Sequence, residues 1–131
     1  MGKLGNGIAA FRDKSGYIGV VRRGTTYNVV MQHNVTQSQS DWSTTSIGYI
    51  ETSEVVLKGK IWLRGVMDAR PSGNKQAIFS YSIDGSSFKS LGTSFTMTTV
   101  WHYFMGYRWG IFNFATEALG GSVLISSFTQ S

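Results

Sequence analysis

The stretch Lys60-Ile-Trp-Leu-Arg-Gly-Val-Met-Asp68 alternates apolar and polar side chains with a period of two. Such alternation is typical of a β-strand, because successive side chains of a strand point to opposite faces of its sheet. Three apolar side chains are expected to face a core: Ile61, Leu63 and Met67. Trp62 and Arg64 then lie together on the opposite, outer face. The stretch therefore predicts a sheet with one buried and one accessible face.

The same period recurs along most of the chain, and helical periodicity is nearly absent. Further strands are expected at residues 17–23, 27–33, 76–83, 107–114 and 122–129, with a polar loop carrying Trp42 at residues 36–46. Two hairpin connections are expected, at residues 24–26 and at Asp84-Gly85, where glycine accepts a positive φ. Eight to nine short strands predict an all-β, single-domain jelly-roll sandwich over residues 1–131. A closed barrel is the alternative that this pattern leaves open.

Strand parity also predicts which side chains are buried. On residues 76–83 the inward set is Ala77, Phe79, Tyr81 and Ile83, which leaves Ser80 and Ser82 outside. On residues 27–33 the inward set is Tyr27, Val29 and Met31, with Asn28, Gln32 and Asn34 outside. The outer face of the sandwich is therefore expected to carry Trp, Arg, Asn, Gln and Ser side chains, which suits a neutral polysaccharide.

Composition excludes several classes of protein. There is no cysteine, so disulfides and thiolate zinc sites are ruled out. No apolar run approaches the roughly 20 residues that span a bilayer, so no membrane partner is expected. The net charge of +5 comes from scattered basic residues, without the stripe that would follow a nucleic-acid backbone. An anionic-polymer binder remains the least favoured alternative, with four arginines as candidates: Arg22, Arg23, Arg64 and Arg70.

The chain offers little catalytic chemistry. Of its seven carboxylates, Glu51 and Glu54 lie three residues apart, so a strand is expected to point them to opposite faces. A glycosidase needs two carboxylates in one site. His33 and His102 lack an acidic partner at ligand spacing. The sequence therefore predicts no enzyme activity, no metal and no cofactor.

The aromatic residues indicate a function more clearly than the carboxylates and histidines do. The chain has four Trp, six Tyr and eight Phe, more than one core of this size needs, and surplus rings usually mark a recognition surface. Five of them fall within Trp101-His-Tyr-Phe-Met-Gly-Tyr-Arg-Trp109, too many for one face of one strand. At least one of these rings is therefore expected in a loop or on the surface, close to Arg108.

These residues carry a resemblance. The segments Phe79-Ser-Tyr-Ser-Ile-Asp-Gly-Ser-Ser-Phe88 and Phe104-Met-Gly-Tyr-Arg-Trp-Gly-Ile-Phe-Asn-Phe-Ala-Thr116, together with Leu119-Gly-Gly-Ser-Val123, resemble the C-terminal domain of family 43 glycoside hydrolases. These are β-xylosidases and α-L-arabinofuranosidases, and the resemblance runs from about Gly7 to Phe128. It implies a concanavalin-A-like sandwich appended to a catalytic five-bladed propeller. Such a domain binds xylan, or lends an aromatic side chain to the rim of the catalytic pocket, which would fall at residues 103–106 with Phe104 foremost.

Two features of this chain depart from that family. Leu124 and Ser126 stand where the family usually has Asp in its final strand, and the family domain is longer at its N-terminus. Lost first strands would bare an edge near residues 122–128, a stretch with neither charge nor Pro to blunt it. We expect residues 1–11 to fold back over that edge, or two chains to pair there as a homodimer.

The sequence thus predicts a non-catalytic carbohydrate-binding module for xylan or a xylo-oligosaccharide, with a catalytic glycosidase domain as its partner in the parent chain. The expected ligand-binding residues are Trp62, Arg64, Trp101, Tyr103, Phe104, Tyr107 and Arg108. The alternative is a structural accessory domain that completes the catalytic domain without its own sugar affinity. An extracellular or periplasmic enzyme is expected, and an intracellular parent is not excluded.

Overall fold

The computed structural model describes residues 3–100, 106–118 and 120–131. Within these ranges the chain forms strands and no helix, so no described segment is a helix that could cross a membrane. The strands are β1 (Lys3–Phe11), β2 (Lys14–Arg23), β3 (Thr26–Gln37), β4 (Thr44–Ser46), β5 (Tyr49–Val56), β6 (Trp62–Met67), β7 (Gln76–Ser82), β8 (Lys89–Ser90), β9 (Phe95–Thr96) and β10 (Arg108–Ala115).

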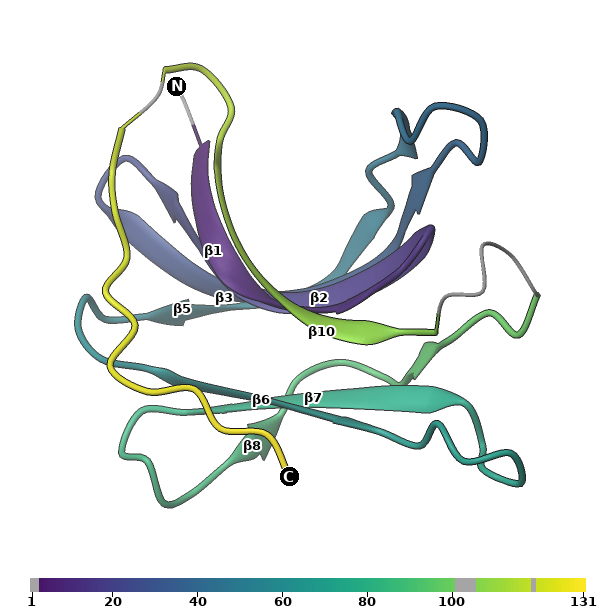
Figure 1. The fold of residues 1–131 in the computed structure, drawn as a ribbon. Helices are drawn as coiled ribbons and strands as arrows, with labels where there is room; N and C mark the ends of the chain where they lie inside the picture. The colour runs from purple at the N-terminus through teal and green to yellow at the C-terminus, as the bar shows by residue number, and fades with distance from the viewer. Residues whose placement is uncertain (1–2, 101–105, 119) are drawn as a thin grey trace.

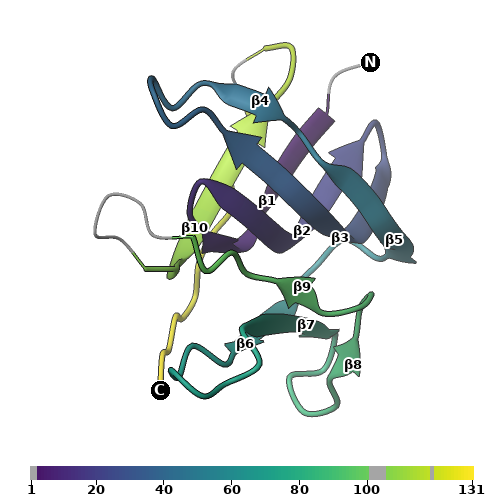
Figure 2. The same cartoon turned by 90° about the vertical axis from the view of Figure 1, so that its right-hand side faces the viewer.

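Two antiparallel sheets form the two layers of the fold. The larger sheet has the order β10-β1-β2-β3-β4, with β5 also paired to β3. The smaller sheet has the order β6-β7-β8, with β9 also paired to β7. Figure 1 shows the larger sheet curved like a trough, with the smaller sheet beneath its convex side, and Figure 2 shows the same two layers from the side. The predicted all-β sandwich is confirmed, and a single closed barrel is not what forms.

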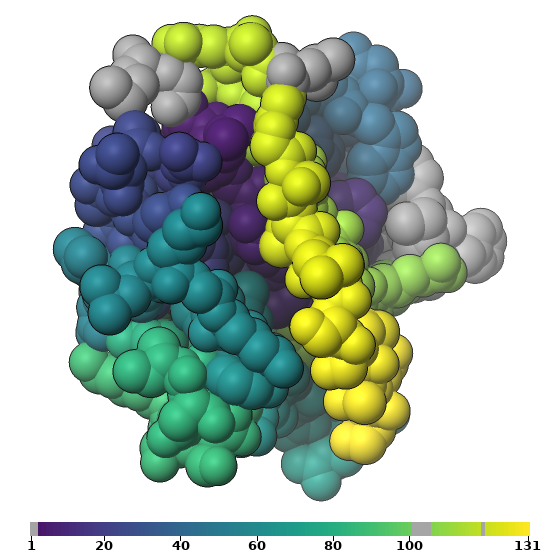
Figure 3. All heavy atoms as spheres, turned by 90° about the vertical axis from the view of Figure 1, so that its left-hand side faces the viewer, coloured from purple at the N-terminus to yellow at the C-terminus, as the bar shows by residue number. Residues whose placement is uncertain are grey.

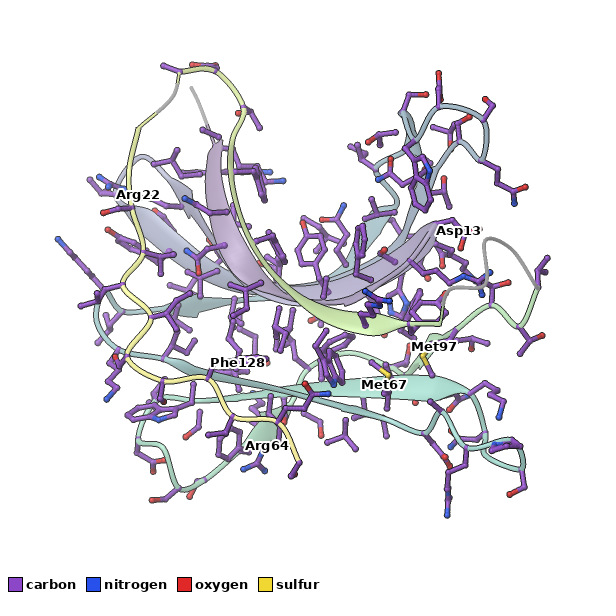
Figure 4. All side chains as sticks on the ribbon, in the orientation of Figure 1. Asp13, Arg22, Arg64, Met67, Met97 and Phe128 are labelled. Carbon is purple, nitrogen blue, oxygen red and sulfur yellow. The ribbon has the colours of Figure 1, made fainter. Side chains whose placement is uncertain are left out.

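The core lies between the two sheets. Its fully buried side chains alternate along their strands: Ile18 on β2, Val29 and Met31 on β3, and Ala77 and Phe79 on β7. Leu91 and Phe95 close the layer from the segments after β8 and in β9. Figure 4 places Met67 and Met97 in the same layer. The predicted inward positions of residues 61–67 and 77–81 are therefore correct.

A pair of glycines permits the close approach of β1 and β2. Gly7 and Gly19 are directly paired across the two strands. A Cβ on Gly7 would lie 2.2 Å from the carbonyl oxygen of Ile18, and a Cβ on Gly19 would lie 2.4 Å from that of Asn6. Any larger residue would push the strands apart. On the same face of the sheet, the Tyr17 and Phe112 rings meet edge to face at 4.6 Å between centroids.

The end of β7 departs from the expected alternation. Ile83 was expected inside but is 71% exposed, and Ser82 was expected outside but is buried. The Ser82 hydroxyl donates to the Asp84 carboxylate at 2.8 Å and accepts the N–H of Gly85 at 2.9 Å. These bonds begin the turn one residue early, so Ile83 leaves the strand before it can reach the core. Gly85 has a φ of +79°, as the predicted Asp-Gly turn requires.

The region after β3 is only partly the predicted loop. β3 continues to Gln37, and β4 returns to pair with it, so residues 36–46 form a short hairpin rather than an irregular loop. Its turn is closed by the N–H of Trp42, which donates to the carbonyl of Ser38 at 3.0 Å. Trp42 lies there 39% exposed.

The predicted last strand is wrong. Residues 120–131, hereafter the C-terminal tail, contain no strand. They run along the open side of the sandwich, as Figure 3 shows in yellow. The expected fold-back of residues 1–11 is also wrong for the part described, because β1 is a central strand between β10 and β2. Both edges of β1 are taken by β10 and β2, so β1 does not pair with the tail as a strand.

Candidate functional site

A long groove opens between the edge strands β6 and β10, with the C-terminal tail along its mouth. Its volume is about 1340 Å³. Four residues predicted from the sequence line it: Trp62, Arg64, Tyr107 and Arg108. The other three, Trp101, Tyr103 and Phe104, lie outside the described residues. The fold therefore brings together two parts of the predicted site that are more than 40 positions apart in the sequence.

Trp62 and Arg64 share the outer face of the smaller sheet, as strand parity predicts. Trp62 is paired with Ser82 and Arg64 with Ser80, and Figure 4 shows the Arg64 side chain on the side away from the core. The Arg64 guanidinium lies over the Phe88 ring, 3.5 Å from its centroid. A stacked guanidinium keeps its edge N–H groups for a ligand while its position is set by the ring.

The Trp62 ring is held by its neighbours. A Cβ on Gly85 would lie 2.9 Å from the ring, so the ring packs directly against the glycine of the Asp84-Gly85 turn. The Lys60 ammonium lies 4.9 Å from the ring centroid. Backbone N–H groups of Ser87 and Ser86 lower the pKa of Asp84 to about 2, so the carboxylate that organises this turn stays ionised. The result is a half-buried, oriented ring at the rim of the groove.

Tyr107 and Arg108 differ in what they can offer a ligand. The Tyr107 hydroxyl donates to the carbonyl of Lys14 at 2.6 Å and accepts the N–H of Thr98 at 3.0 Å. Its ring packs edge to face on Phe95, and burial raises the pKa of its hydroxyl. Arg108 is exposed at the start of β10. Tyr107 therefore braces the sandwich, while Arg108 is free to reach the groove.

Two groove residues were not singled out from the sequence. Phe88 sets the position of Arg64, and the sequence feature that points to it is the hairpin connection predicted at Asp84-Gly85, just before it. Trp109 lies deep in the groove, edge to face with Phe79 at 6.1 Å. A Cβ on Gly65 would lie 2.4 Å from the Trp109 ring, so glycine at that position of β6 makes room for the indole.

On the other side of the sandwich, Glu51 and Glu54 both reach across to the smaller sheet. The expectation that they point to opposite faces is wrong. Met31 pairs with Thr52 and Gln32 with Ile50, so Glu51 is an extra, bulged residue in β5. The bulge turns Glu51 toward the side already occupied by Glu54.

Each carboxylate ties the two sheets together. Glu51 accepts the N–H of Thr93 at 2.8 Å and also bonds His33, so His33 has an acidic partner 18 residues away that its sequence spacing did not indicate. Burial by itself would raise the pKa of Glu51, but the bonds from Thr93 and His33 outweigh it and the pKa is lowered. Glu54 accepts from Lys89 at 2.8 Å and from the Tyr81 hydroxyl, and these bonds lower its pKa.

Both carboxylates are therefore occupied by structural bonds. Within the described ranges, no three His, Cys, Asp or Glu side chains gather as they would around a metal ion.

Comparison with known proteins assigns the family. Residues 6–129 match the model of the β-xylosidase C-terminal concanavalin A-like domain. The chain belongs to this family. The concanavalin-A-like sandwich expected from the sequence is thus confirmed, and in family 43 enzymes this domain is an accessory to the catalytic domain. A search of curated proteins found no match.

Two solved structures are similar to this concanavalin A-like domain. One is an engineered GH43 glycoside hydrolase that displays endo-xylanase and exo-arabinofuranosidase activity, with 34% identity and a TM-score of 0.82. The other is a bifunctional GH43-CE protein of Bacteroides eggerthii, with 25% identity and a TM-score of 0.69. Each match covers 92% of this chain, but only 27% and 16% of the respective larger chains. The domain therefore corresponds to a minor part of each enzyme.

Proposed function

We propose that this domain binds a xylan chain as the non-catalytic accessory module of a family 43 glycosidase. The observation that carries the proposal is the outer face of β6, where the half-buried Trp62 ring lies beside Arg64 stacked on Phe88. A sugar ring stacks its C–H face on a flat aromatic, and a guanidinium edge donates to its hydroxyl oxygens. Both groups are oriented before any ligand arrives, which lowers the ordering cost of binding.

The shape and charge of the surface support a neutral, extended ligand. The groove is lined by β6 and by Arg108, and its volume of about 1340 Å³ leaves room for more than a single sugar. Most of its walls are apolar or uncharged. The similarity to a GH43 enzyme with endo-xylanase and exo-arabinofuranosidase activity supports xylan as the substrate class. Such a ligand suits a secreted or periplasmic parent enzyme.

Affinity gel electrophoresis with soluble xylan, arabinoxylan, cellulose derivative and heparin tests this proposal. We expect retardation by the two xylans only, with a micromolar to millimolar dissociation constant because few contacts offset the ordering of a flexible chain. Trp62→Ala should weaken binding on the order of tenfold, by analogy with stacking of bases on aromatic rings. Ile83→Ala is the matched control, since this exposed residue lies beyond the end of β7.

Three outcomes would redirect the proposal. Wild-type retardation of a folded Trp62→Ala variant would overturn the site. Retardation by heparin alone, lost at high salt, would favour an anionic-polymer binder. Measurable hydrolysis of aryl xylosides that co-purifies with the chain and is lost on Glu51→Gln would overturn the non-catalytic assignment.

A structural accessory role is the second candidate, and one observation favours it. The C-terminal tail exposes Leu124 at 91% and Ile125 at 51%, and these apolar side chains could pack on a catalytic domain. Absence of retardation by any polysaccharide would support this role over xylan binding.

A further inference from the structure

Among the strands that the structure describes, β6 has a partner on one edge alone. It hydrogen-bonds to β7 on one side and ends the smaller sheet on the other. The neighbouring tail does not complete the sheet, because it forms no hydrogen bond or ion pair with another described residue. Backbone N–H and C=O groups along this edge therefore remain available to another strand.

The edge of β6 is less protected than the edge of β5. Strand β5 is also an edge strand, but it carries a bulge at Glu51 and a second carboxylate at Glu54. Bulges and charges are the usual means of blocking strand addition. Strand β6 is regular along its whole pairing with β7, and its single charge is Arg64.

The surroundings of the edge are apolar and accessible. Val66 on β6 is 59% exposed, and the tail beside it has neither charge nor Pro. Figure 3 shows the tail crossing this side of the molecule with the groove beside it. Because backbone hydrogen bonds between the tail and other described residues are absent, the tail can move aside or pack over a newly added strand without breaking any of them.

We propose that β6 pairs with β6 of a second copy, antiparallel and centred on Gly65, so that two smaller sheets become one. Directly opposed residues lie on the same face of a sheet, which allows only two registers with five pairs inside Trp62–Met67. One is centred on Arg64 and opposes the two Arg64 side chains, which is unfavourable. The other, centred on Gly65, opposes Arg64 to Val66 and Leu63 to Met67. Charge therefore selects the Gly65 register.

The dimer has a consequence for ligand binding that rests on the proposed function. Pairing consumes only backbone groups at the edge, so the outer faces stay open. Trp62 and Arg64 of both copies would lie on one continuous face, and a polysaccharide chain could contact both. Two linked sites bind a polymer more tightly than either alone.

Light scattering and sedimentation of the intact chain test the dimer. We expect a mass of twice 14.4 kDa for the intact chain. Val66→Lys would place a lysine opposite each Arg64 and should give a monomer, with dimer partly restored by salt. Val66→Glu would oppose Arg64 with a carboxylate and should keep the dimer. Val55→Lys, the same change at a 72% exposed site on β5, is the matched control and should leave the dimer intact.

Several results would overturn the interface. These are a monomeric parent, a folded Val66→Lys variant that stays dimeric, or dissociation by Ile111→Lys on β10 and not by Val66→Lys. Gel retardation separates the two proposals. If the chain is a dimer but no xylan retards it, the xylan-binding proposal fails and the interface stands. If the chain is a monomer that xylan retards, the interface fails and the xylan-binding proposal stands. If both hold, Val66→Lys should bind xylan with several-fold lower apparent affinity.

Discussion

The two long sides of the sandwich are closed in different ways. On one side, Glu51 and Glu54 of β5 bridge to Thr93, Tyr81 and Lys89, so charged hydrogen bonds join the sheets. On the other, β6 and β10 face each other across a groove, and the C-terminal tail lies along it. The first side is built from specific polar bonds, the second from apolar surface left accessible.

This difference shows where stability and recognition are separated in the molecule. Glu51 and Glu54 on the bridged side have their partners within the chain, so their bonds contribute to folding. On the open side, Trp62 is positioned by packing against Gly85 and Arg64 by its contact with the Phe88 ring. We therefore expect substitutions on the bridged side to change stability, and those on the open side to change binding or assembly.

The largest effect is expected from the core that both sides enclose. Phe79→Ala removes a ring that is 1% exposed and supports Trp109, and should lower the free energy of unfolding by about 3–5 kcal/mol. Leu124→Ala on the open side, at a 91% exposed position, should change it by less than about 0.5 kcal/mol. Urea unfolding followed by Trp fluorescence measures both. A comparable loss in the two variants would mean that the tail is part of the core.

A smaller loss in the free energy of unfolding is expected when the hydrogen bonds of Glu51 between the two sheets are weakened. Glu51→Gln weakens the bonds from Thr93 and His33, and should cost about 1–2 kcal/mol, as this side chain is only partly buried. Thr93→Val is the graded control, because it removes the hydroxyl bond and keeps the backbone N–H. The urea concentration at the unfolding midpoint should be lowest for Glu51→Gln, intermediate for Thr93→Val and highest for the parent. Unchanged xylan retardation in both variants would sharpen the separation of the two sides.

The smallest expected effect is the change in folding stability with pH that Glu51 and Glu54 cause. Hydrogen bonds lower the pKa of Glu51 and Glu54 in the folded state from an ordinary value of 4.5. The resulting stabilisation is fully present above that value and is lost as the pH falls through the lowered folded pKa. The parent should therefore lose stability as the pH falls below the ordinary value of 4.5, and the difference in stability between the parent and Glu51→Gln should narrow as it does. A gap that widens on acidification would contradict the assigned bridge.

Strand parity predicted much of the fold and part of the site. It placed Phe79 in the core and Trp62 with Arg64 on the outer face, because both depend only on the local alternation of one regular strand. It failed at Ile83, where turn bonds to Ser82 end the strand early. It failed again at Glu51, because a bulge depends on how β5 meets β3 and leaves no mark in the spacing of carboxylates.

By itself, the sequence determined the all-β class, the inward and outward faces of regular strands, and the family, since each of these is carried by local periodicity or by motifs within short segments. Only the tertiary structure decided that Arg64 stacks on Phe88, that both glutamates bridge the sheets, and that Tyr107 braces the interior. It also decided that residues 122–129 form no strand despite their β-prone composition. A strand forms only where a neighbouring strand offers hydrogen-bond partners to its backbone N–H and C=O groups. That neighbour is determined by residues far away in the chain.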